Sequence, residues 1–543
     1  MNPAANVVRL FNTVRYLRPV QIYGRFWFRL AKPRMDLRPV PSLRPVPGSW
    51  CRPAERRPSM TGPDRFRFLN VEQALGDVGW DDPALPKLWR YNEHYFDDLC
   101  AEGSSRRAGW HRDLLLRWVS ENEPPRGTGW EPYPTSLRIV NWCKWMLAGN
   151  DLPPQCLQSL AVQVRWLGGR LEWHLLGNHL FVNAKALVFA GCVFDGDEAD
   201  GWLARGIDIL RQQIPEQILE DGGQFERSPM YHALAVEDML DLLNLGKAYA
   251  DRLAPLVPLL ESRISAMRRW LAAMCHPDGE IAFFNDAAIG VHPSPSQLER
   301  YAIDLGLGAT DRIADGLTVL GPSGYARLQS DFGTTVAIFD VGRIGPDYLP
   351  GHSHADTLAV ELSVRGRRVL VNSGTSEYGT SAERLRQRGT AAHNTMTVDG
   401  TDSSEVWGGF RVARRAIPID LEFTEGSVLS VACSHDGFRR LAGRPIHRRK
   451  LTLSTGRLLI EDFLDAPGRT RSHWHFRPGL RLCSAGVAGT FCLEPDAVRM
   501  DFRGATVDIG TCCWYPEFGV AVSNACAIAT THRAISSTRI YWD

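Results

Sequence analysis

The chain has 543 residues, of which 44% are hydrophobic and 23% charged, and its formal net charge is +1. This length exceeds one ordinary hydrophobic core, so two large globular domains are expected. A nearly neutral charge argues against a dedicated nucleic-acid-binding protein. The 12 cysteines are scattered without a CxxC pair, which favours reduced, buried thiols over a disulfide framework or a zinc ribbon.

The N-terminal 60 residues differ in charge from the rest of the chain. They hold 12 Lys or Arg and two acids, a local charge of +10, which leaves −9 for residues 61–543 (+1 minus +10). Arginines among apolar residues in 1–30 predict one or two amphipathic helices, which dock on the protein itself or lie on an anionic membrane surface. Prolines concentrated in residues 33–58 predict an extended strap or linker.

Neither export nor membrane insertion is predicted by the sequence. Arg9, Arg15 and Arg18 interrupt the N-terminal segment, which lacks the continuous apolar core of a signal peptide. No stretch approaches the ~20 apolar residues that a membrane span requires. We therefore expect a cytoplasmic protein, with peripheral membrane contact through the basic N-terminus or non-classical export as the alternatives.

Helical periodicity dominates residues 65–320. Apolar residues recur at three- and four-residue spacing in the segments 101–120, 157–176, 203–219, 234–252 and 256–275. Short polar or Gly/Pro breaks separate these segments. Helices of similar length with short breaks predict antiparallel hairpins stacked into an array or toroid, here over residues 61–322.

The pattern changes after about residue 325, where short β-rich segments follow one another to the C-terminus. They are residues 335–341, 358–364, 367–371, 450–454, 458–461, 505–510 and 520–522. A run of helices followed by a run of strands predicts an α+β protein with separate domains. The second domain is expected to be an antiparallel β-sandwich over residues 323–543.

Two stretches of the helical half combine aromatic residues with charged or amide side chains. Trp130, Tyr133 and Arg138 lie in one of them, and aromatic faces stack on sugar rings while arginine binds carboxylates. Aromatic residues at a domain interface, with hydrogen-bonded polar tips, are the structural alternative. Asn178 precedes an apolar helical run and could simply cap a helix.

A glycine-rich turn at residues 221–228 leads into a predicted helix with Tyr231 in its first turn. The positive end of such a helix would stabilise a developing phenolate or a bound anion. Glu226 and Arg227 stand in the same turn and are candidate substrate contacts.

Histidines concentrate in the β half. His352, His354 and Asp356 fall within six residues, ahead of a predicted strand, and His393 follows about forty residues later. Such a cluster suits metal binding or proton transfer, and hydrogen-bonded surface histidines are the alternative.

A polar and aromatic cluster surrounds His393 in the sequence: Glu377, Tyr378, Arg384, Arg388, Glu405, Trp407, Arg411 and Arg414. Arg388, Glu405 and Trp407 are candidate substrate contacts, because arginine suits bidentate carboxylate or sulfate recognition, whereas solvated loop charges are the alternative.

The stretches NHLFVNAKALVFAG, DGGQFERSPMYH, GHSHAD and RGTAAHNTMTVDG, in this order, resemble the heparinase II/III family of polysaccharide lyases. The resemblance implies an (α/α) toroid, a β-sandwich and an active site between them. It also implies β-elimination on a uronic acid, which needs a base for the C5 proton, an acid for the C4 oxygen and a group that neutralises the carboxylate. By this resemblance Asn178 hydrogen-bonds the carboxylate, Tyr231 serves as base, acid or both, and His352 is its partner, so which of the two is the base stays open.

A metal ion is implied by the same resemblance. His354 and His393 match positions that hold a metal in parts of the family, and Asn372 takes the place of a third ligand that is usually aspartate. Asparagine brings no charge, so it lowers the expected affinity for zinc or another divalent cation. Asp356 is then expected to orient a histidine instead. No organic cofactor is implied.

Three functions stay open at this point. The first is a lyase acting on a uronate-containing acidic polysaccharide, and the second is a non-catalytic glycan-binding or polysaccharide-assembly protein of the same architecture. The third is a metal-dependent hydrolase, because HSHAD fits the HxHxD pattern of the metallo-β-lactamase fold. That fold expects histidine where this chain has Thr357, and an αββα sandwich. Substrates from heparan sulfate and alginate to a bacterial exopolysaccharide fit the lyase hypothesis.

Overall fold

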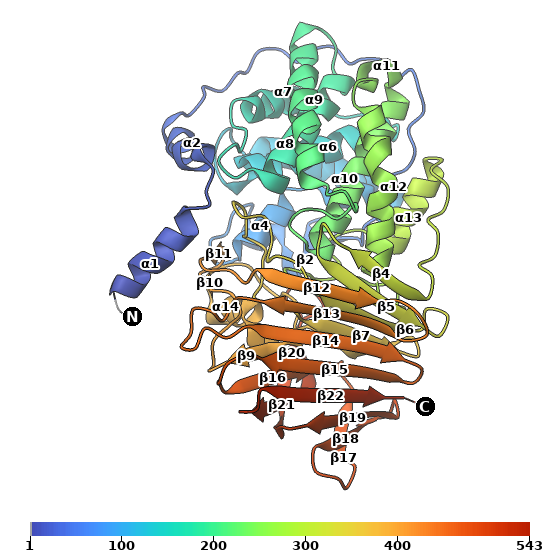
Figure 1. The fold of residues 1–543 in the computed structure, drawn as a ribbon. Coiled ribbons are helices and arrows are strands. Elements are labelled where there is room, and N and C mark those ends of the chain that lie inside the picture. Colours follow the sequence, from blue (N-terminus) through green and yellow to red (C-terminus); the bar gives the residue numbers. More distant parts are fainter. Residues whose placement is uncertain (1–2, 543) are drawn as a thin grey trace.

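The computed structural model describes residues 3–542 and divides them into a helical half and a β half (Figure 1). The helices of the first half are α3 (Leu75–Val78), α4 (Lys87–Glu93), η1 (Asp97–Cys100), η2 (Ser104–Arg107), α5 (Ala108–Glu121), η3 (Thr128–Trp130), α6 (Pro132–Leu147), α7 (Pro154–Gly168), α8 (Gly177–Val193), α9 (Asp197–Gln217), α10 (Pro229–Ala248), α11 (Ala250–Leu253), α12 (Val257–Ala273) and α13 (Pro295–Asp304). The predicted α+β architecture, a helical toroid followed by antiparallel sheets, is confirmed.

Helix α8 forms the centre of the helical half. It is apolar on every side and buried from Leu180 to Val193, as expected for a helix surrounded by others. Helices α6, α7, α9 and α10 pack around it. Helix α9 comes especially close, because a Cβ atom at Gly191 would lie 2.6 Å from the Leu203 side chain. The first turn of this central helix reaches the junction with the β half.

Each of the five predicted helices is present as α5, α7, α9, α10 or α12, with shifted ends. Residues 60–74 form a small sheet of strands β1 (Met60–Gly62), β2 (Arg65–Phe68) and β3 (Val71–Ala74), so the helical signal predicted from about residue 65 is wrong for residues 65–74. Burial of Phe66 and Phe68 alternates with exposure of Arg65 and Arg67, a period of two that favours a strand over a helix at β2.

The β half contains three antiparallel sheets. The five-stranded sheet has the order β4 (Gly316–Leu320), β5 (Tyr325–Ser330), β6 (Thr335–Asp340), β7 (Val360–Val364) and β8 (Arg367–Leu370). The four-stranded sheet has the order β20 (Thr506–Trp514), β21 (Val522–Thr531), β16 (Thr470–His475) and β9 (Met396–Val398). The eight-stranded sheet has the order β12 (Pro418–Thr424), β13 (Leu429–His435), β14 (His447–Ser454), β15 (Arg457–Leu464), β22 (Ile535–Tyr541), β19 (Val498–Arg503), β18 (Thr490–Glu494) and β17 (Arg481–Ser484). The remaining elements are α14 (Ala382–Arg388), η4 (Thr390–Ala392) and the hairpin of β10 (Val406–Trp407) and β11 (Arg411–Val412).

Strand β6 shows how the two halves join, because it is buried on both faces. Ala337 and Phe339 point into the sandwich core, and Val336 and Ile338 point toward Trp270 of α12. The five-stranded sheet therefore lies between the helices and the eight-stranded sheet. Strand β4 begins at Gly316, before the predicted boundary at 322–323, because the glycines of residues 321–324 form a hairpin turn inside the sheet.

The N-terminal segment runs along the outside. Helices α1 (Pro3–Val14) and α2 (Pro19–Leu30), dark blue in Figure 1, lie beside the junction of the two halves. Residues 31–58 then follow the helical half as an extended strap, as predicted. The Gly48 amide donates to Ala248 O at 3.0 Å, and Cys51 N donates to Asn244 Oδ1 at 3.0 Å. Among residues 3–542, every helix is too short or too polar to cross a bilayer.

Candidate active site

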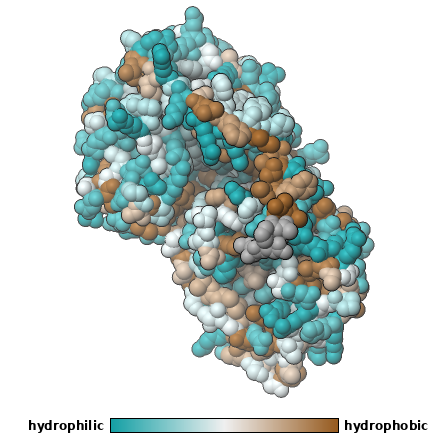
Figure 2. Space-filling model, turned by 90° about the vertical axis from the view of Figure 1, so that its left-hand side faces the viewer, coloured by the Kyte–Doolittle hydropathy of each residue, from teal (hydrophilic) through white to brown (hydrophobic). Residues whose placement is uncertain are grey.

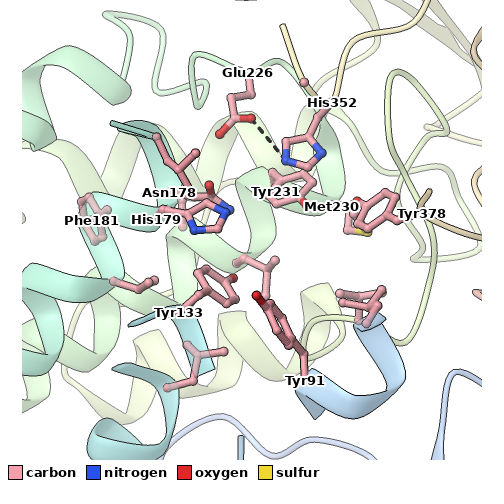
Figure 3. A pocket seen from close by; sticks show the side chains of 18 of the residues that line it. Tyr91, Tyr133, Asn178, His179, Phe181, Glu226, Met230, Tyr231, His352 and Tyr378 are labelled. Carbon is pink, nitrogen blue, oxygen red and sulfur yellow. Dashed lines mark hydrogen bonds and ion pairs between the residues drawn. The ribbon is translucent and has the colours of Figure 1, made fainter. Parts of the chain in front are cut away.

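A cleft of about 1190 Å³ separates the helical half from the β half. Helices α4, α6, α8 and α10 line one wall, and the loops around residues 347–352, 378–379 and 410–412 line the other. Residues of α1 and α2 border the cleft as well. The three residues predicted to be catalytic, Asn178, Tyr231 and His352, all face this cleft (Figure 3).

Asn178 lies in the first turn of α8. The cap position belongs to Leu176, so the structural alternative that Asn178 caps the helix is wrong. Within residues 3–542 its amide side chain has no hydrogen-bond partner, and it is only partly buried. The amide is therefore free to bind a ligand at the positive end of the central helix.

Tyr231 lies in the first turn of α10, as the sequence predicted. Ser228 caps this helix, because its Oγ accepts a hydrogen bond from Tyr231 N at 3.2 Å. The Tyr231 hydroxyl lies 2.9 Å from the hydroxyl of Tyr378. Burial, reinforced by Tyr378, raises the pKa of Tyr231 well above 10, so the phenol keeps its proton at neutral pH.

His352 approaches Tyr231 from the β half, and the two ring centroids are 4.0 Å apart. Its Nδ1 lies 2.9 Å from Asp286 Oδ2, and its Nε2 lies 3.8 Å from Glu226 Oε2. Because an ionised Asp286 can only accept, the network assigns the proton of neutral His352 to Nδ1. Nε2 is then an unprotonated nitrogen that can accept a proton in the cleft.

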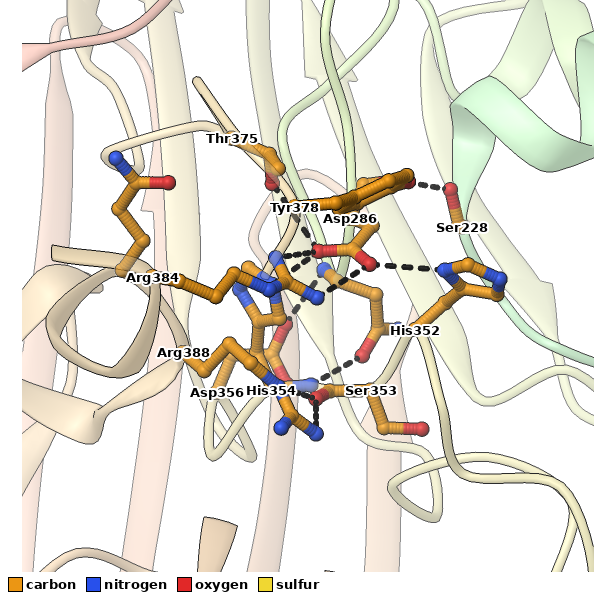
Figure 4. Close-up of polar contacts among 12 residues, drawn as sticks. Ser228, Asp286, His352, Ser353, His354, Asp356, Thr375, Tyr378, Arg384 and Arg388 are labelled. Carbon is orange, nitrogen blue, oxygen red and sulfur yellow. Dashed lines mark hydrogen bonds and ion pairs between the residues drawn. The ribbon is translucent and has the colours of Figure 1, made fainter. Parts of the chain in front are cut away.

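Asp286 is the centre of a buried charge network that the sequence analysis did not predict (Figure 4). Its carboxylate accepts hydrogen bonds from His352 Nδ1, from His354 Nε2 at 2.8 Å and from both terminal nitrogens of Arg384, one of them at 2.7 Å. Burial alone would raise the pKa of Asp286, but Arg384 and the histidine hydrogen bonds hold it well below its usual value. The polar pair Asn285-Asp286 inside an apolar run was the only signal in the sequence.

Asp356 does not orient a histidine, contrary to the prediction. Its Oδ2 accepts the backbone N–H of Asn285 at 2.8 Å, and burial raises its pKa. Asn285 in turn binds the backbone N–H of His354 through its side-chain oxygen at 3.0 Å. Asp286 therefore takes the role that was assigned to Asp356.

The predicted metal ligands His354 and His393 face each other, with Nδ1 and Nε2 3.1 Å apart. Burial lowers the pKa of His354 to about 4 and that of His393 to about 3, so both are neutral. The Asn372 amide oxygen already accepts the backbone N–H of Asn394 at 3.0 Å. Within residues 3–542 no group of three or more His, Cys, Asp or Glu side chains is placed to hold a metal ion. This donor set does not fit a zinc site, so the metal stays a prediction and no step below uses it.

Tyr133 and Glu226, among the predicted substrate contacts, line the cleft. Trp130 and Arg138 do not. The Arg138 guanidinium stacks 3.8 Å from the Trp118 ring and donates to Gln163 Oε1 and to backbone carbonyls, inside the toroid. Trp130 is buried and donates to Asn122 O at 3.2 Å. The two side chains stabilise the wall, and their predicted contact with substrate is wrong.

Arg227 and Arg388 are also directed to backbone carbonyls and not to the cleft. Arg227 donates to Arg343 O, and the buried Arg388 donates twice to Ser353 O, at 3.0 and 2.8 Å. Burial and the nearby Arg384 cation lower the pKa of Arg388 to about 9. Arg388 thereby fixes the loop that carries the two histidines, instead of binding substrate as predicted.

Glu405 and Trp407 lie outside the cleft, which contradicts the last two predicted contacts. Glu405 forms an ion pair with Arg414, 2.7 Å between Oε1 and Nη2. Trp407 donates its Nε1–H to Thr13 Oγ1 of helix α1 at 3.1 Å. Phe410 and Arg411, close by in the same segment, do line the cleft. The sequence alone does not show which residues of this segment reach the cleft.

The helical wall carries cations that are mostly paired. Lys185 Nζ lies 2.7 Å from Asp238 and 2.6 Å from Asp241, and Lys144 contacts the same Asp241. Arg56 pairs with Glu237. The helical wall therefore carries cations at fixed positions, and each of these cations has a carboxylate partner that balances its charge.

A helical toroid joined to antiparallel sheets, with a Tyr–His cleft at the junction, defines a two-domain protein whose site needs both halves. Residues 117–301 match the family described as Heparinase II/III N-terminus, and residues 314–543 match Heparinase II/III-like, C-terminal. The chain belongs to the heparinase II/III family.

Relatives of known function and structure agree with this family. The chain is 28% identical over 299 residues to a heparin-sulfate lyase of Bacteroides stercoris, covering 50% of this chain and 43% of that protein. It is 26% identical over 251 residues to a heparin-sulfate lyase of Pedobacter heparinus, covering 41% and 36%. The chain thus matches less than half of the length of these two relatives. A crystal structure of heparinase III has the same fold, with a TM-score of 0.70, 16% identity and coverage of 96% of this chain and 89% of that one.

Proposed function

We propose that the protein is a polysaccharide lyase that cleaves a uronic-acid-containing acidic polysaccharide by β-elimination. The observation that carries the proposal is the meeting of Asn178, Tyr231 and His352, contributed by both halves, in one cleft. Family membership and the names of the curated relatives support the same reaction. The hydrolase alternative required an αββα sandwich, and the fold is a different one.

The substrate carboxylate is assigned to Asn178. The C5 proton of a uronate is weakly acidic while the adjacent carboxylate is charged, so neutralising that charge lowers the barrier. Asn178 offers an unpaired amide N–H₂ at the N-terminus of α8, where the helix dipole adds positive potential. Glu226 lies on the same helical wall, where its Oε1 would be 3.7 Å from a Cβ atom at Gly177, and burial raises the pKa of its carboxyl group.

His352 is the proposed base and Tyr231 the proposed acid. His352 Nε2 takes the C5 proton, the C5–H electron pair forms the C4–C5 double bond, and the C4–O bond breaks. Tyr231, protonated because its pKa is raised, gives its proton to the departing oxygen. Transfer of the proton from the imidazolium to the phenolate, whose rings are in contact, restores the starting state.

The reaction is tested by following the ultraviolet absorbance of the unsaturated product with heparin, heparan sulfate, alginate, chondroitin and hyaluronan. Tyr231→Phe and His352→Ala are each expected to lower kcat/KM by at least about a hundredfold on the active polymer. Tyr541→Phe and His532→Ala lie far from the cleft and serve as matched controls. If the wild-type protein gave no absorbance increase with any of these polysaccharides, the proposal would be contradicted. Binding without cleavage would favour the non-catalytic alternative.

A second experiment separates the acid from the base. A uronide with fluoride at C4 has a leaving group that needs little proton donation, so it should rescue Tyr231→Phe and not His352→Ala. Rescue of His352→Ala and not of Tyr231→Phe would mean that His352 is the acid and Tyr231 the base.

A further inference from the structure

Helices α1 and α2, residues 3–30, are consecutive in the chain and carry many exposed apolar side chains; the name N-terminal hairpin refers to these two helices and their connection. Ten large apolar side chains of the hairpin are exposed: Val7, Val8, Leu10, Phe11, Val14, Ile22, Tyr23, Phe26, Trp27 and Leu30. Phe26 is 65% exposed, Trp27 72% and Leu30 81%. We call these ten residues the apolar stripe. Brown, hydrophobic side chains gather in a band on the face shown in Figure 2. Contiguous apolar surface of this kind marks an interaction site.

Contacts with the rest of the protein fix which side of the hairpin faces outward. Gln21 is buried and donates to Tyr348 O at 3.1 Å, and a Cβ atom at Gly24 would lie 3.1 Å from the His174 Cβ atom. The Phe28 ring lies 4.2 Å from the His174 ring. Because this side of α2 is occupied, the stripe residues of α2 on the opposite side are held toward solvent.

The same segment is strongly basic. Residues 3–34 contain seven Lys or Arg and no Asp or Glu. Arg29, Lys32 and Arg34 at the end of α2 are exposed, and none of them has an ion-pair partner among residues 3–542. An apolar face bordered by unpaired cations matches an anionic lipid surface, in which acyl chains and negative headgroups are adjacent.

We propose that the N-terminal hairpin docks on an anionic membrane surface, with the apolar stripe inserted at the level of the headgroups. Each helix has 12 residues, about 18 Å at 1.5 Å per residue, so the hairpin lies in the interface and does not span the ~30 Å hydrocarbon core. A second copy of the chain is a poorer partner, since two equally basic hairpins repel each other.

The position of the hairpin links docking to the cleft. Six of its residues line the cleft: Leu10, Thr13, Val14, Leu17, Gln21 and Arg25. Leu10 and Val14 of the apolar stripe thus border the cleft, and the other eight stripe residues do not line it. A docked protein therefore presents the cleft mouth next to the lipid headgroups, where a glycan carried on the membrane surface would enter. The docking itself does not depend on the proposed lyase activity.

Cosedimentation of the full chain with vesicles tests the proposal. Vesicles of phosphatidylcholine alone are compared with vesicles containing about one third phosphatidylglycerol. The wild-type protein should bind the anionic vesicles, and Phe26→Ser combined with Trp27→Ser should lower the partition coefficient at least about tenfold. Phe332→Ser, a fully exposed phenylalanine (100%) on the turn before β6, is the matched control and should bind as wild type. Arg29→Glu with Arg34→Glu should remove the preference for anionic vesicles.

Three results would overturn the proposal. The first is that the wild-type protein binds neither kind of vesicle. The second is that Phe332→Ser lowers the partition coefficient as much as Phe26→Ser with Trp27→Ser does. The third is that the wild-type protein is a dimer by light scattering and the Phe26→Ser, Trp27→Ser variant is a monomer. The last result would assign the stripe to a second copy of the chain. Cleavage of a soluble polysaccharide by the docking variants separates this proposal from the proposed function, because neither Phe26 nor Trp27 lines the cleft.

Discussion

On the helical wall of the cleft, Asn178 and Tyr231 stand in the first turns of α8 and α10, whereas on the β wall His352 stands in a loop. The helix starts position their side chains through the backbone, with one capping serine at α10. The loop positions His352 through buried charges, Asp286 and Arg384. The positions of the side chains should therefore withstand the loss of one polar contact behind the helical wall better than a change of charge behind the β wall.

The largest effect is expected from the β wall. Asp286→Asn leaves the buried Arg384 without its counter-charge and replaces one of the two oxygens that accept from His352, His354 and Arg384 by a donor NH₂ group. We expect the free energy of unfolding to fall by about 3–5 kcal/mol and kcat/KM to fall with it, because a broken buried ion pair leaves an uncompensated charge. Urea unfolding and the absorbance assay measure the two effects.

Asp462→Asn is the matched control for this prediction. Asp462 accepts from the buried Arg449 at 2.8 Å and from His447 at 2.7 Å, the same Arg–Asp–His combination inside the sandwich and away from the cleft. This variant should lose comparable stability and keep its kcat/KM at temperatures where it is folded. Equal loss of activity in both variants would mean that Asp286 acts through stability alone.

An intermediate effect is expected from the interior of the helical wall. Arg138→Lys loses the hydrogen bonds of a planar guanidinium to Gln163 and two backbone carbonyls, and leaves those acceptors buried. We expect the free energy of unfolding to fall by about 2–3 kcal/mol with KM unchanged. A raised KM at unchanged stability would restore Arg138 to the substrate contacts from which the structure removes it.

The smallest effect is expected at the start of α10. Ser228→Ala removes the hydroxyl that caps the helix beneath Tyr231 and that donates to Asp286 O. Loss of such a cap costs about 1 kcal/mol. Ser294→Ala, which removes the cap of α13 far from the cleft, should cost a similar amount in thermal unfolding. A drop in kcat for Ser228→Ala beyond that of Ser294→Ala would show that the helical wall also depends on side-chain contacts.

The order of helices and strands, and the three residues that meet in the cleft, could be predicted because periodicity and ordered motifs are local signals. The role of Asp286 could not be predicted from the sequence, because it depends on contacts with residues 66 to 98 positions further along the chain. Arg138 and Arg388 were misassigned for a related reason. A cation near a motif can face a ligand or a backbone carbonyl, and only the packing of the surrounding elements decides which.

The strap of residues 31–58 affects the order in which parts of the chain can fold during translation. Its partners Asn244 and Ala248 leave the ribosome nearly two hundred residues after Cys51 and Gly48. Until α10 has emerged, Gly48 and Cys51 lack these partners, whereas Val40 and Arg44 of the same strap already have theirs in Gln158 and Val193. The N-terminal hairpin completes its contacts later still, because Gln21 and Thr13 bind Tyr348 and Trp407 of the β half.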